Sequence, residues 1–387
     1  MDALGFAHRA NGSAISPEDA CGKLAHLGKT HAATRSPEVV VDAILGTVTS
    51  KWSYKFFHFI VEALPRIALL LQERPQLFPL AHSAEFPMSL QGTQRIRGHA
   101  KGNRSSALLL VSCKSRLVKE ALQILGVDVQ RSVLCWKLGH TYKTSNSLLW
   151  PAASPCGGAR QPALRALRRF AMPPPMRPVR FASEVYSSGR VVLHERTGSR
   201  RMTNHDEVLA ALLNTELPRP TRSDSLTLGT SSSPRISLAP FVTVLNGNGT
   251  VALHAQIELF RSARCQVGPH GAGMALMLFA PTPWFGTAEV TPGAYFVEIR
   301  GKPGDHLNRH RNRTSKWVAN PKPNACYRGL AATMGQRHEW LVMSGMPANE
   351  DLSPEVDAVI KMAFRMCTLP LELSRDATEA AAQVGAG

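Results

Sequence analysis

The sequence lacks the features that mark several common protein classes. Its 387 residues contain no run of about 18 apolar residues, so no transmembrane helix is predicted. The first 16 residues hold no apolar core of the signal-peptide type. The seven cysteines include no CxxC pair, which argues against a zinc ribbon or a thioredoxin-like site, and they leave the redox compartment open. No Gly-x-Ser-x-Gly elbow is present, so an α/β-hydrolase is not expected.

Acidic residues and aromatic residues are both scarce. The 45 Lys and Arg exceed the 28 Asp and Glu by 17, and aromatic residues make up only 6% of the chain. Such an excess of positive charge favours anionic partners, namely nucleic acid, a membrane surface or the phosphates of a small ligand. Nucleic-acid binding is the weaker alternative, because the arginines are spread over several loops and few aromatic side chains can stack on bases.

Apolar periodicity predicts an α/β fold with a largely parallel sheet. Pro65 should kink the first long helix, and Asn204 with Glu207 forms a predicted capping box. The expected strands cover residues 39–45, 107–113, 132–136, 190–194, 241–245, 264–267, 295–299 and 338–343, and the expected helices cover 53–73, 115–125, 204–214, 251–263 and a segment after Gly273.

Composition also divides the chain into predicted domains. A segment rich in Pro, Gly and Arg, residues 151–178, is predicted as a loop that ends in the interdomain hinge. The expected parts are an irregular arm (1–38), an N-terminal Rossmann-like acceptor-side domain (39–180), a C-terminal Rossmann-like nucleotide-sugar-binding domain (181–350) with a disordered insertion (217–240), and a C-terminal helix with a frayed tail (351–387).

The segment Gly268-Pro269-His270-Gly271-Ala272-Gly273 is the most informative motif, because it joins an expected strand to an expected helix. Small residues let the backbone approach a ligand closely, and the free N–H groups at a helix start favour a phosphate. A plain glycine-rich turn is the alternative, and His270 favours the binding site.

A group of arginines follows the first strand of the second expected domain. Ligands of open α/β sheets bind at such strand ends, and Arg196, Arg200 and Arg201 could hold a diphosphate through forked hydrogen bonds. A solvated basic loop is the alternative.

His58, Glu62 and Arg66 recur at four-residue intervals and therefore share one face of the first long helix. This spacing fits an exposed stripe of ion pairs, or else a buried general base that faces a cleft. Asp-x-Asp pairs are missing throughout, so a metal-bound nucleotide site of that type has no ligands.

In this order, the segments resemble glycosyltransferase family 61. The resemblance covers roughly residues 40–345 and departs from the family pattern at the 217–240 insertion, at residues 282–294, and in the membrane anchor that is not seen in this chain. It rests on Phe57-His58-Phe59 with Glu62-Ala63-Leu64-Pro65-Arg66, on the segment from Arg196 to Glu207, on Ile257-Glu258-Leu259-Phe260, on Gly268–Gly273 with Phe279 and Pro281, and on Val297-Glu298-Ile299.

The resemblance implies two Rossmann-like domains that face a cleft, the GT-B arrangement. It implies an inverting transfer of xylose, N-acetylglucosamine or arabinose from a UDP-sugar to a glycan or glycoprotein acceptor. No cofactor, no metal and no nucleic-acid partner are expected, and the family points to the Golgi or endoplasmic reticulum lumen. A nucleic-acid-binding protein, or an inactive family member that only binds, are the alternatives.

Residue roles follow from the resemblance. Glu62 is the expected catalytic base, oriented by His58, and Glu298 is expected to accept hydrogen bonds from the ribose hydroxyls. The expected donor-binding residues are Arg196, Arg200, Arg201, Asn204, His270, Gly271, Ala272 and Gly273.

Overall fold

A computed structural model describes the chain in two compact units, Met1–Pro174 and Pro175–Gly387. The predictions for the N-terminal arm, for residues 219–234 of the insertion and for the frayed tail lie outside the described residues. Those described are 38–48, 55–78, 107–113, 115–137, 140–151, 158–171, 190–197, 200–218, 235–239, 242–246, 250–282, 293–302, 326–347 and 351–368.

The first unit is built on a parallel sheet of strand order β4-β3-β2-β6. Counted along the chain this order is 3-2-1-4, as in one half of a Rossmann fold, with the switch point between β2 and β6. The strands are β1 (Glu38–Val41), β2 (Ile44–Thr47), β3 (Ala107–Val111), β4 (Val133–Cys135), β5 (Thr141–Thr144) and β6 (Leu148–Leu149). The helices are α1 (Phe56–His58), the π-helical turn η2 (Phe59–Ala63), α2 (Leu64–Glu73), α3 (Arg116–Ile124), α4 (Val129–Ser132) and α5 (Gln161–Ala171).

The single strand predicted over residues 39–45 is wrong, because the chain forms two strands there. β1 pairs with β5 in a separate two-stranded sheet, and β2 enters the main sheet. The chain bends between them at Asp42, whose carboxylate accepts hydrogen bonds from the side chains of Ser145 and Asn146.

The first long helix is interrupted by a widened turn close to Pro65, whereas the kink expected at Pro65 itself stays a prediction. The π-helical turn η2 separates α1 from α2, and Pro65 lies in the first turn of α2, where its missing N–H is tolerated. Apolar residues of this segment fill the core, including Ile60, Leu64 and Ile67.

The loop predicted over residues 151–178 is wrong in its middle, where the chain forms α5. One face of α5 is buried and packs against α2, whereas Arg165 and Arg169 are exposed. The many arginines and Pro162 concealed an apolar spacing typical of a helix.

The second unit contains a five-stranded parallel sheet of order β10-β7-β11-β12-β13. The parallel α/β prediction is thus confirmed in both units. The strands are β7 (Arg190–Glu195), β8 (Glu216–Pro218), β9 (Arg235–Ser237), β10 (Val242–Asn246), β11 (Ala263–Pro269), β12 (Tyr295–Lys302) and β13 (Arg337–Pro347), with β8 and β9 paired as a separate antiparallel hairpin. The helices are α7 (His205–Leu213), α8 (Leu253–Ser262), the 3₁₀ helix η4 (Ala272–Phe279), α9 (Cys326–Thr333) and α10 (Val356–Thr368).

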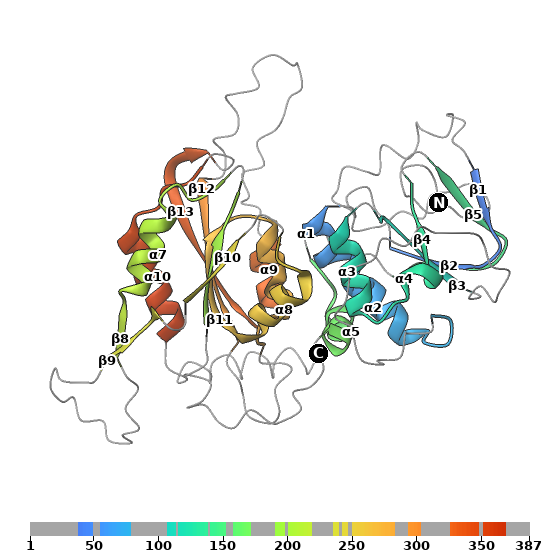
Figure 1. Cartoon of the computed structure of the whole chain (residues 1–387), viewed down its shortest axis with the longest axis horizontal. Coiled ribbons are helices and arrows are strands. Elements are labelled where there is room, and N and C mark those ends of the chain that lie inside the picture. The colour runs from blue at the N-terminus through green and yellow to red at the C-terminus, as the bar shows by residue number, and fades with distance from the viewer. Residues whose placement is uncertain are drawn as a thin grey trace, which may run out of the picture. The chain divides into compact units, whose positions relative to one another are not determined.

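Helices cover both faces of this sheet, with α7 and α10 on one side and α8 and α9 on the other (Figure 1). On the α7–α10 side the strand residues are apolar, and Leu193, Val267 and Val297 join one buried core. On the opposite side, the alternate residues of the same strands include polar side chains, among them His194 and Glu298. The sheet order, counted along its own strands, is 2-1-3-4-5, so its switch point lies between β7 and β11.

The local predictions for the second unit have different outcomes. The helix expected after Gly273 is present as a 3₁₀ helix that begins at Ala272, and α9 is a helix that was not expected. The capping box is not formed, because the side chain of Asn204 makes no cap hydrogen bond and donates to the Pro354 carbonyl instead. Among the described helices, none has the length and apolar character needed to cross a membrane.

Candidate functional site

The predicted donor-binding segments meet at the switch point of the second unit. Arg196 directly follows β7, and His270 directly follows β11. Nη1 of Arg196 donates a hydrogen bond to the carbonyl oxygen of His270 over 2.7 Å. Ligands of open α/β sheets bind at this position, where neighbouring loops leave the carboxyl ends of the strands in opposite directions.

The glycines of the motif allow close packing beneath this site. A Cβ added to Gly271 would lie 1.7 Å from Nη1 of Arg196, and one added to Gly268 would lie 2.5 Å from Cβ of His194. The φ angle of Gly271 is −177°, which is extended backbone, so space and not conformation requires glycine there. The glycines therefore leave the space that two side chains occupy, namely His194 of β7 and Arg196 of the loop that follows it.

His194 is a packing residue beneath the motif. Its ring is buried, lies edge-on to Phe260 and has Nε2 3.4 Å from Oε1 of Gln266. Burial lowers the pKa of His194 to about 4, although the contact with Gln266 opposes this shift. The ring is therefore neutral at ordinary pH.

Glu298 lies at the centre of a buried hydrogen-bond network. Its Oε1 accepts from Nδ1 of His270 (2.5 Å), and its Oε2 accepts from Nε2 of His338 (2.7 Å) and Nε1 of Trp340 (3.1 Å). The residue is 0% exposed. The ribose contact predicted for Glu298 remains a prediction, and it would require this network to open.

The charge of Glu298 is stabilised in place. Burial alone would raise its pKa, but hydrogen bonds from His270 and His338, together with their electrostatic attraction, lower it to about 2. Nη1 of Arg300 lies 4.0 Å from Oε1 as a further cation. The carboxylate is therefore ionised throughout the physiological range.

The arginine segment divides into two parts. Burial first, and electrostatic repulsion from Arg200 second, lower the pKa of Arg196. Arg200 has a φ of 62°, in the left-handed region that side chains rarely adopt, and its buried Nε has no hydrogen-bond partner among the described residues. Such strain often accompanies functional positions.

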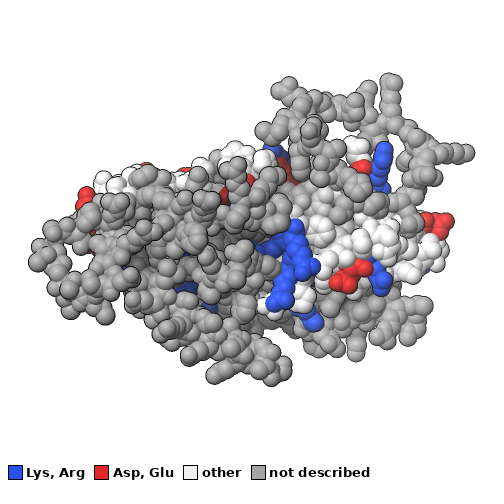
Figure 2. Space-filling model, turned by 90° about the horizontal axis from the view of Figure 1, so that it is seen from below, with Lys and Arg blue, Asp and Glu red and all other residues white. Residues whose placement is uncertain are grey.

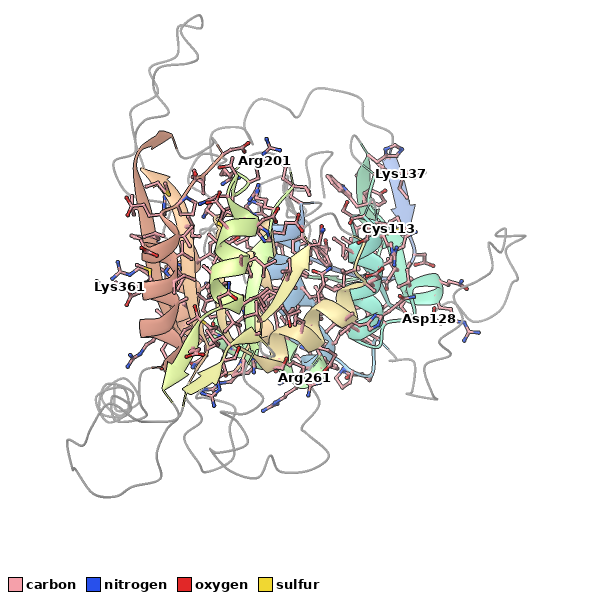
Figure 3. All side chains as sticks on the ribbon, turned by 60° about the vertical axis from the view of Figure 1, so that its left-hand side comes forward. Cys113, Asp128, Lys137, Arg201, Arg261 and Lys361 are labelled. Carbon is pink, nitrogen blue, oxygen red and sulfur yellow. A yellow bond between two sulfur atoms is a disulfide. The ribbon has the colours of Figure 1, made fainter. Side chains whose placement is uncertain are left out.

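Arg201 and Asn204 face another part of the chain. Nε of Arg201 pairs with Asp351 over 2.7 Å, and the side chain of Asn204 donates to the carbonyl of Pro354 over 2.7 Å. Figure 3 shows Arg201 at one end of the sheet, with Arg261 at the opposite end. These two predicted donor residues tie the loop to the segment before α10, and their donor contact stays a prediction.

The other residues of the glycine motif differ in how accessible their backbone is to a ligand. The backbone N–H of His270 donates to the Ile299 carbonyl, so this amide is already used. Ala272 is exposed and Gly273 is half-buried, whereas the remainder of η4 is buried. Ala272 and Gly273 are thus the part of the predicted helix start that a phosphate can reach.

The predicted base lies in the first unit, in the helical segment that follows β2 along the chain. Glu62 belongs to the turn η2, and its Oε1 lies 2.9 Å from Nδ1 of His58, with side-chain exposures of 17% and 23%. Arg66 is buried one turn later and donates to the carbonyl of Pro151, which closely follows β6. Burial lowers the pKa of Arg66 to about 10, while Glu62 opposes this shift. The face is partly buried, as a general base in a cleft requires.

A family model described as Glycosyltransferase 61 matches residues 56–284, which is more than half of the chain. This chain belongs to glycosyltransferase family 61. No curated protein matches it. The matched range includes Glu62, the arginine segment and the glycine motif.

Three residues of this glycosyltransferase were missed from the sequence: Tyr327, His338 and Trp340. The hydroxyl of Tyr327, on α9, donates to the Gly271 carbonyl, and His338 and Trp340 extend from β13 to Glu298. The alternation of His338 and Trp340 along one predicted strand was a usable signal, because both lie on the face that Glu298 shares.

The described charged residues are unevenly distributed over one face of this glycosyltransferase. On the face seen in Figure 2, Lys and Arg form one larger group, with Asp and Glu in small separate groups. Within the described ranges, no three His, Cys, Asp or Glu side chains are arranged to hold a metal ion.

Proposed function

We propose that this glycosyltransferase transfers xylose, N-acetylglucosamine or arabinose from a UDP-sugar to a glycan or glycoprotein acceptor, with inversion and without a metal. The observation that carries the proposal is the hydrogen bond that places Arg196 beside His270 at the switch point, where the positive charge of Arg200 also acts on Arg196. Two guanidinium groups repel each other until an anion lies between them, and a diphosphate fits forked donors of this kind. The proposal includes the two-domain GT-B arrangement.

In the proposed reaction, Glu62 removes the proton from the acceptor hydroxyl while the hydroxyl oxygen attacks the anomeric carbon of the sugar. The bond from that carbon to the UDP oxygen breaks, and the released UDP carries the negative charge. Arg196, Arg200 and His270 stabilise this charge, which develops in the transition state. The hydrogen bond to His58 keeps the Glu62 carboxylate oriented for its task.

The proposed compartment is the Golgi or endoplasmic reticulum lumen. A disulfide joins Cys113 to Cys135, the last residue of β4, with a Cα–Cα distance of 5.3 Å, and Cys265 is also disulfide-bonded. Disulfides persist in oxidising compartments and are rare in the cytosol. This observation supports the localisation that the family suggests.

Calorimetry with UDP tests the proposal directly. The wild type should bind UDP in EDTA, and Arg200→Ala should weaken binding about 10- to 100-fold, since a hydrogen bond to a charged group contributes about 1.5–3 kcal/mol. Arg261→Ala is the matched control, because its ion pair with Glu258 lies at the opposite end of the sheet. No UDP binding by the wild type, or binding that needs manganese, would contradict the proposal. Binding without transfer to any acceptor would indicate an inactive family member.

A further inference from the structure

We propose that Glu298 is a positioning residue that keeps a proton on Nδ1 of His270, so that Nε2 is the ring atom that takes up a second proton from solvent and donates it in a hydrogen bond to the donor diphosphate. Trp340 and His338 support this role, because both donate hydrogen bonds to the other carboxylate oxygen, Oε2. The inference rests on the proposed function of His270, and it gives Glu298 a task other than the ribose contact predicted from the sequence.

The hydrogen-bond inventory of the network fixes where the protons are. The indole Nε1 of Trp340 can only donate, so Oε2 of Glu298 must accept there. An ionised carboxylate has no proton to give, so Nδ1 of His270 and Nε2 of His338 must donate as well. One acceptor group therefore determines the tautomer of both imidazoles.

The remaining contacts of His270 hold the ring in place without using Nε2. Arg196 binds the carbonyl of His270, its backbone N–H binds Ile299, and Tyr327 lies edge-on to the ring with centroids 5.5 Å apart. The side chain is 19% exposed, and its one hydrogen bond to the described residues uses Nδ1. Among the described contacts, Nε2 is thus the ring nitrogen that remains for a ligand. The hydrogen bond to Glu298 prevents a ring flip that would exchange the positions of Nδ1 and Nε2.

The substitution Glu298→Gln should change the tautomer of His270, and this change can be measured. The amide has one acceptor oxygen and one NH₂ group that can only donate. Because Trp340 donates at the Oε2 side, the amide oxygen must take that side and the NH₂ group must face His270. Nδ1 of His270 must then accept, so the neutral ring changes to the Nε2–H tautomer.

A second substitution should reverse the effect. In the double variant Glu298→Gln, Trp340→Phe, no obligatory donor faces the Oε2 side, and His338 can accept there by changing its own tautomer. The amide can then turn its oxygen to His270 and restore the Nδ1–H tautomer. A merely structural role for Glu298 predicts no such recovery, because the loss of a second hydrogen-bonding group would only add to the destabilisation of the network.

Nitrogen-15 NMR of the full chain with labelled histidine measures the tautomer. The signal of His270 among the 14 histidines is assigned by its loss in His270→Gln, and the ring is titrated to its neutral form. We expect Nδ1–H in the wild type, Nε2–H in Glu298→Gln, and Nδ1–H again in the double variant. Glu339→Gln is the matched control, because Glu339 pairs with Val297 and lies on the opposite face of the sheet.

The outcomes separate this inference from the proposed function. A wild-type ring in the Nε2–H form, or a tautomer that Glu298→Gln leaves unchanged, overturns the positioning role even if UDP binds. The wild-type measurement decides this point even if a variant fails to fold. The expected tautomers together with absent UDP binding would retain the positioning role and reject the proposed donor site.

Discussion

Glu62 is the residue of the first unit for which we propose the role of catalytic base. It lies in a widened helical turn, bonded to His58 and one turn before the buried Arg66. Widened turns of this kind often occur at functional sites, since they re-aim a side chain within an otherwise regular helix. At this scale, the geometry agrees with a base that is held in place and still partly open to solvent.

Glu62→Gln should lower kcat about 10²- to 10⁴-fold and leave the Kd of UDP unchanged, because the amide cannot accept the acceptor proton. Steady-state transfer assays and calorimetry measure the two quantities separately. Glu73→Gln is the matched control, since Glu73 is the exposed last residue of α2. Near-normal kcat in Glu62→Gln would remove Glu62 from the role of base.

Single residues show how far the sequence could predict the site. Arg201 and Asn204 were predicted as donor-site residues. Their partners Asp351 and Pro354 were not predicted, because each lies 150 residues further along the chain. Glu298 was expected to contact a ligand, and it is buried, because two histidines and a tryptophan on other elements surround it. Such pairings depend on strand register, which a single sequence does not contain.

At the scale of elements, the glycine motif and the arginine loop act as one packed unit. Arg196 occupies the space beside Gly271, and α9 holds the same turn through Tyr327. A substitution that displaces one of these two elements should therefore also displace the other at the proposed donor site.

Gly271→Ala should weaken UDP binding about 10- to 100-fold without unfolding the chain. The new Cβ would displace the guanidinium of Arg196 and break its hydrogen bond to His270, a charged bond of about 1.5–3 kcal/mol. The extended backbone at Gly271 accepts alanine without strain. Calorimetry measures the affinity, and thermal unfolding measures the stability.

Gly329→Ala is the matched control for this substitution. Gly329 lies within α9, and no atom lies within 4 Å of its added Cβ, so alanine should stabilise the helix by about 0.5–1 kcal/mol. An equal loss of affinity in both variants would show that the effect of Gly271→Ala is not local to Arg196.

Elements were predictable where they are apolar runs or amphipathic stripes. Parallel strands buried on both faces, such as β3 and β11, stand out as short apolar runs, and α3 was expected from its stripe, with Ser115 capping it. α5 was missed because composition was given more weight than spacing. The division between β1 and β2 depends on Asp42 and on partners from about a hundred residues later, which no local pattern records.

At the scale of the whole molecule, the disulfide links two segments of the first unit that are 22 residues apart, shortly after β3 and at the end of β4. Closing a loop of this length in the unfolded chain corresponds to about 3 kcal/mol. The double variant Cys113→Ser, Cys135→Ser should lose about this much stability within the first unit. Hydrogen exchange of β3, α3 and β4 should rise while that of β12 stays unchanged. Equal exchange in both proteins would contradict a stabilising role.

The second unit should be sensitive to mild acid, because a neutral histidine is buried in it. The pKa of His194 is about 4 in the folded chain, below the ordinary value of 6.5, so the unfolded chain binds more protons between these two pH values. Stability is therefore complete above pH 6.5 and falls as the pH drops towards 4, by about 3 kcal/mol. Glu298 changes protonation in a lower window, between its ordinary 4.5 and about 2, and contributes its own loss there.

The variant His194→Asn separates these two windows, since asparagine does not titrate. Denaturant unfolding of wild type and variant at pH 7 and at pH 4, followed by hydrogen exchange in β7 and β11, measures the difference in unfolding free energy. The wild type should be the more stable at pH 7, and its advantage should shrink by about 3 kcal/mol at pH 4, because only the wild type has a histidine to charge. An advantage that stays constant would mean that His194 takes up its proton in the folded state near its ordinary pKa. Burial beneath the glycine motif would then not exclude its charge.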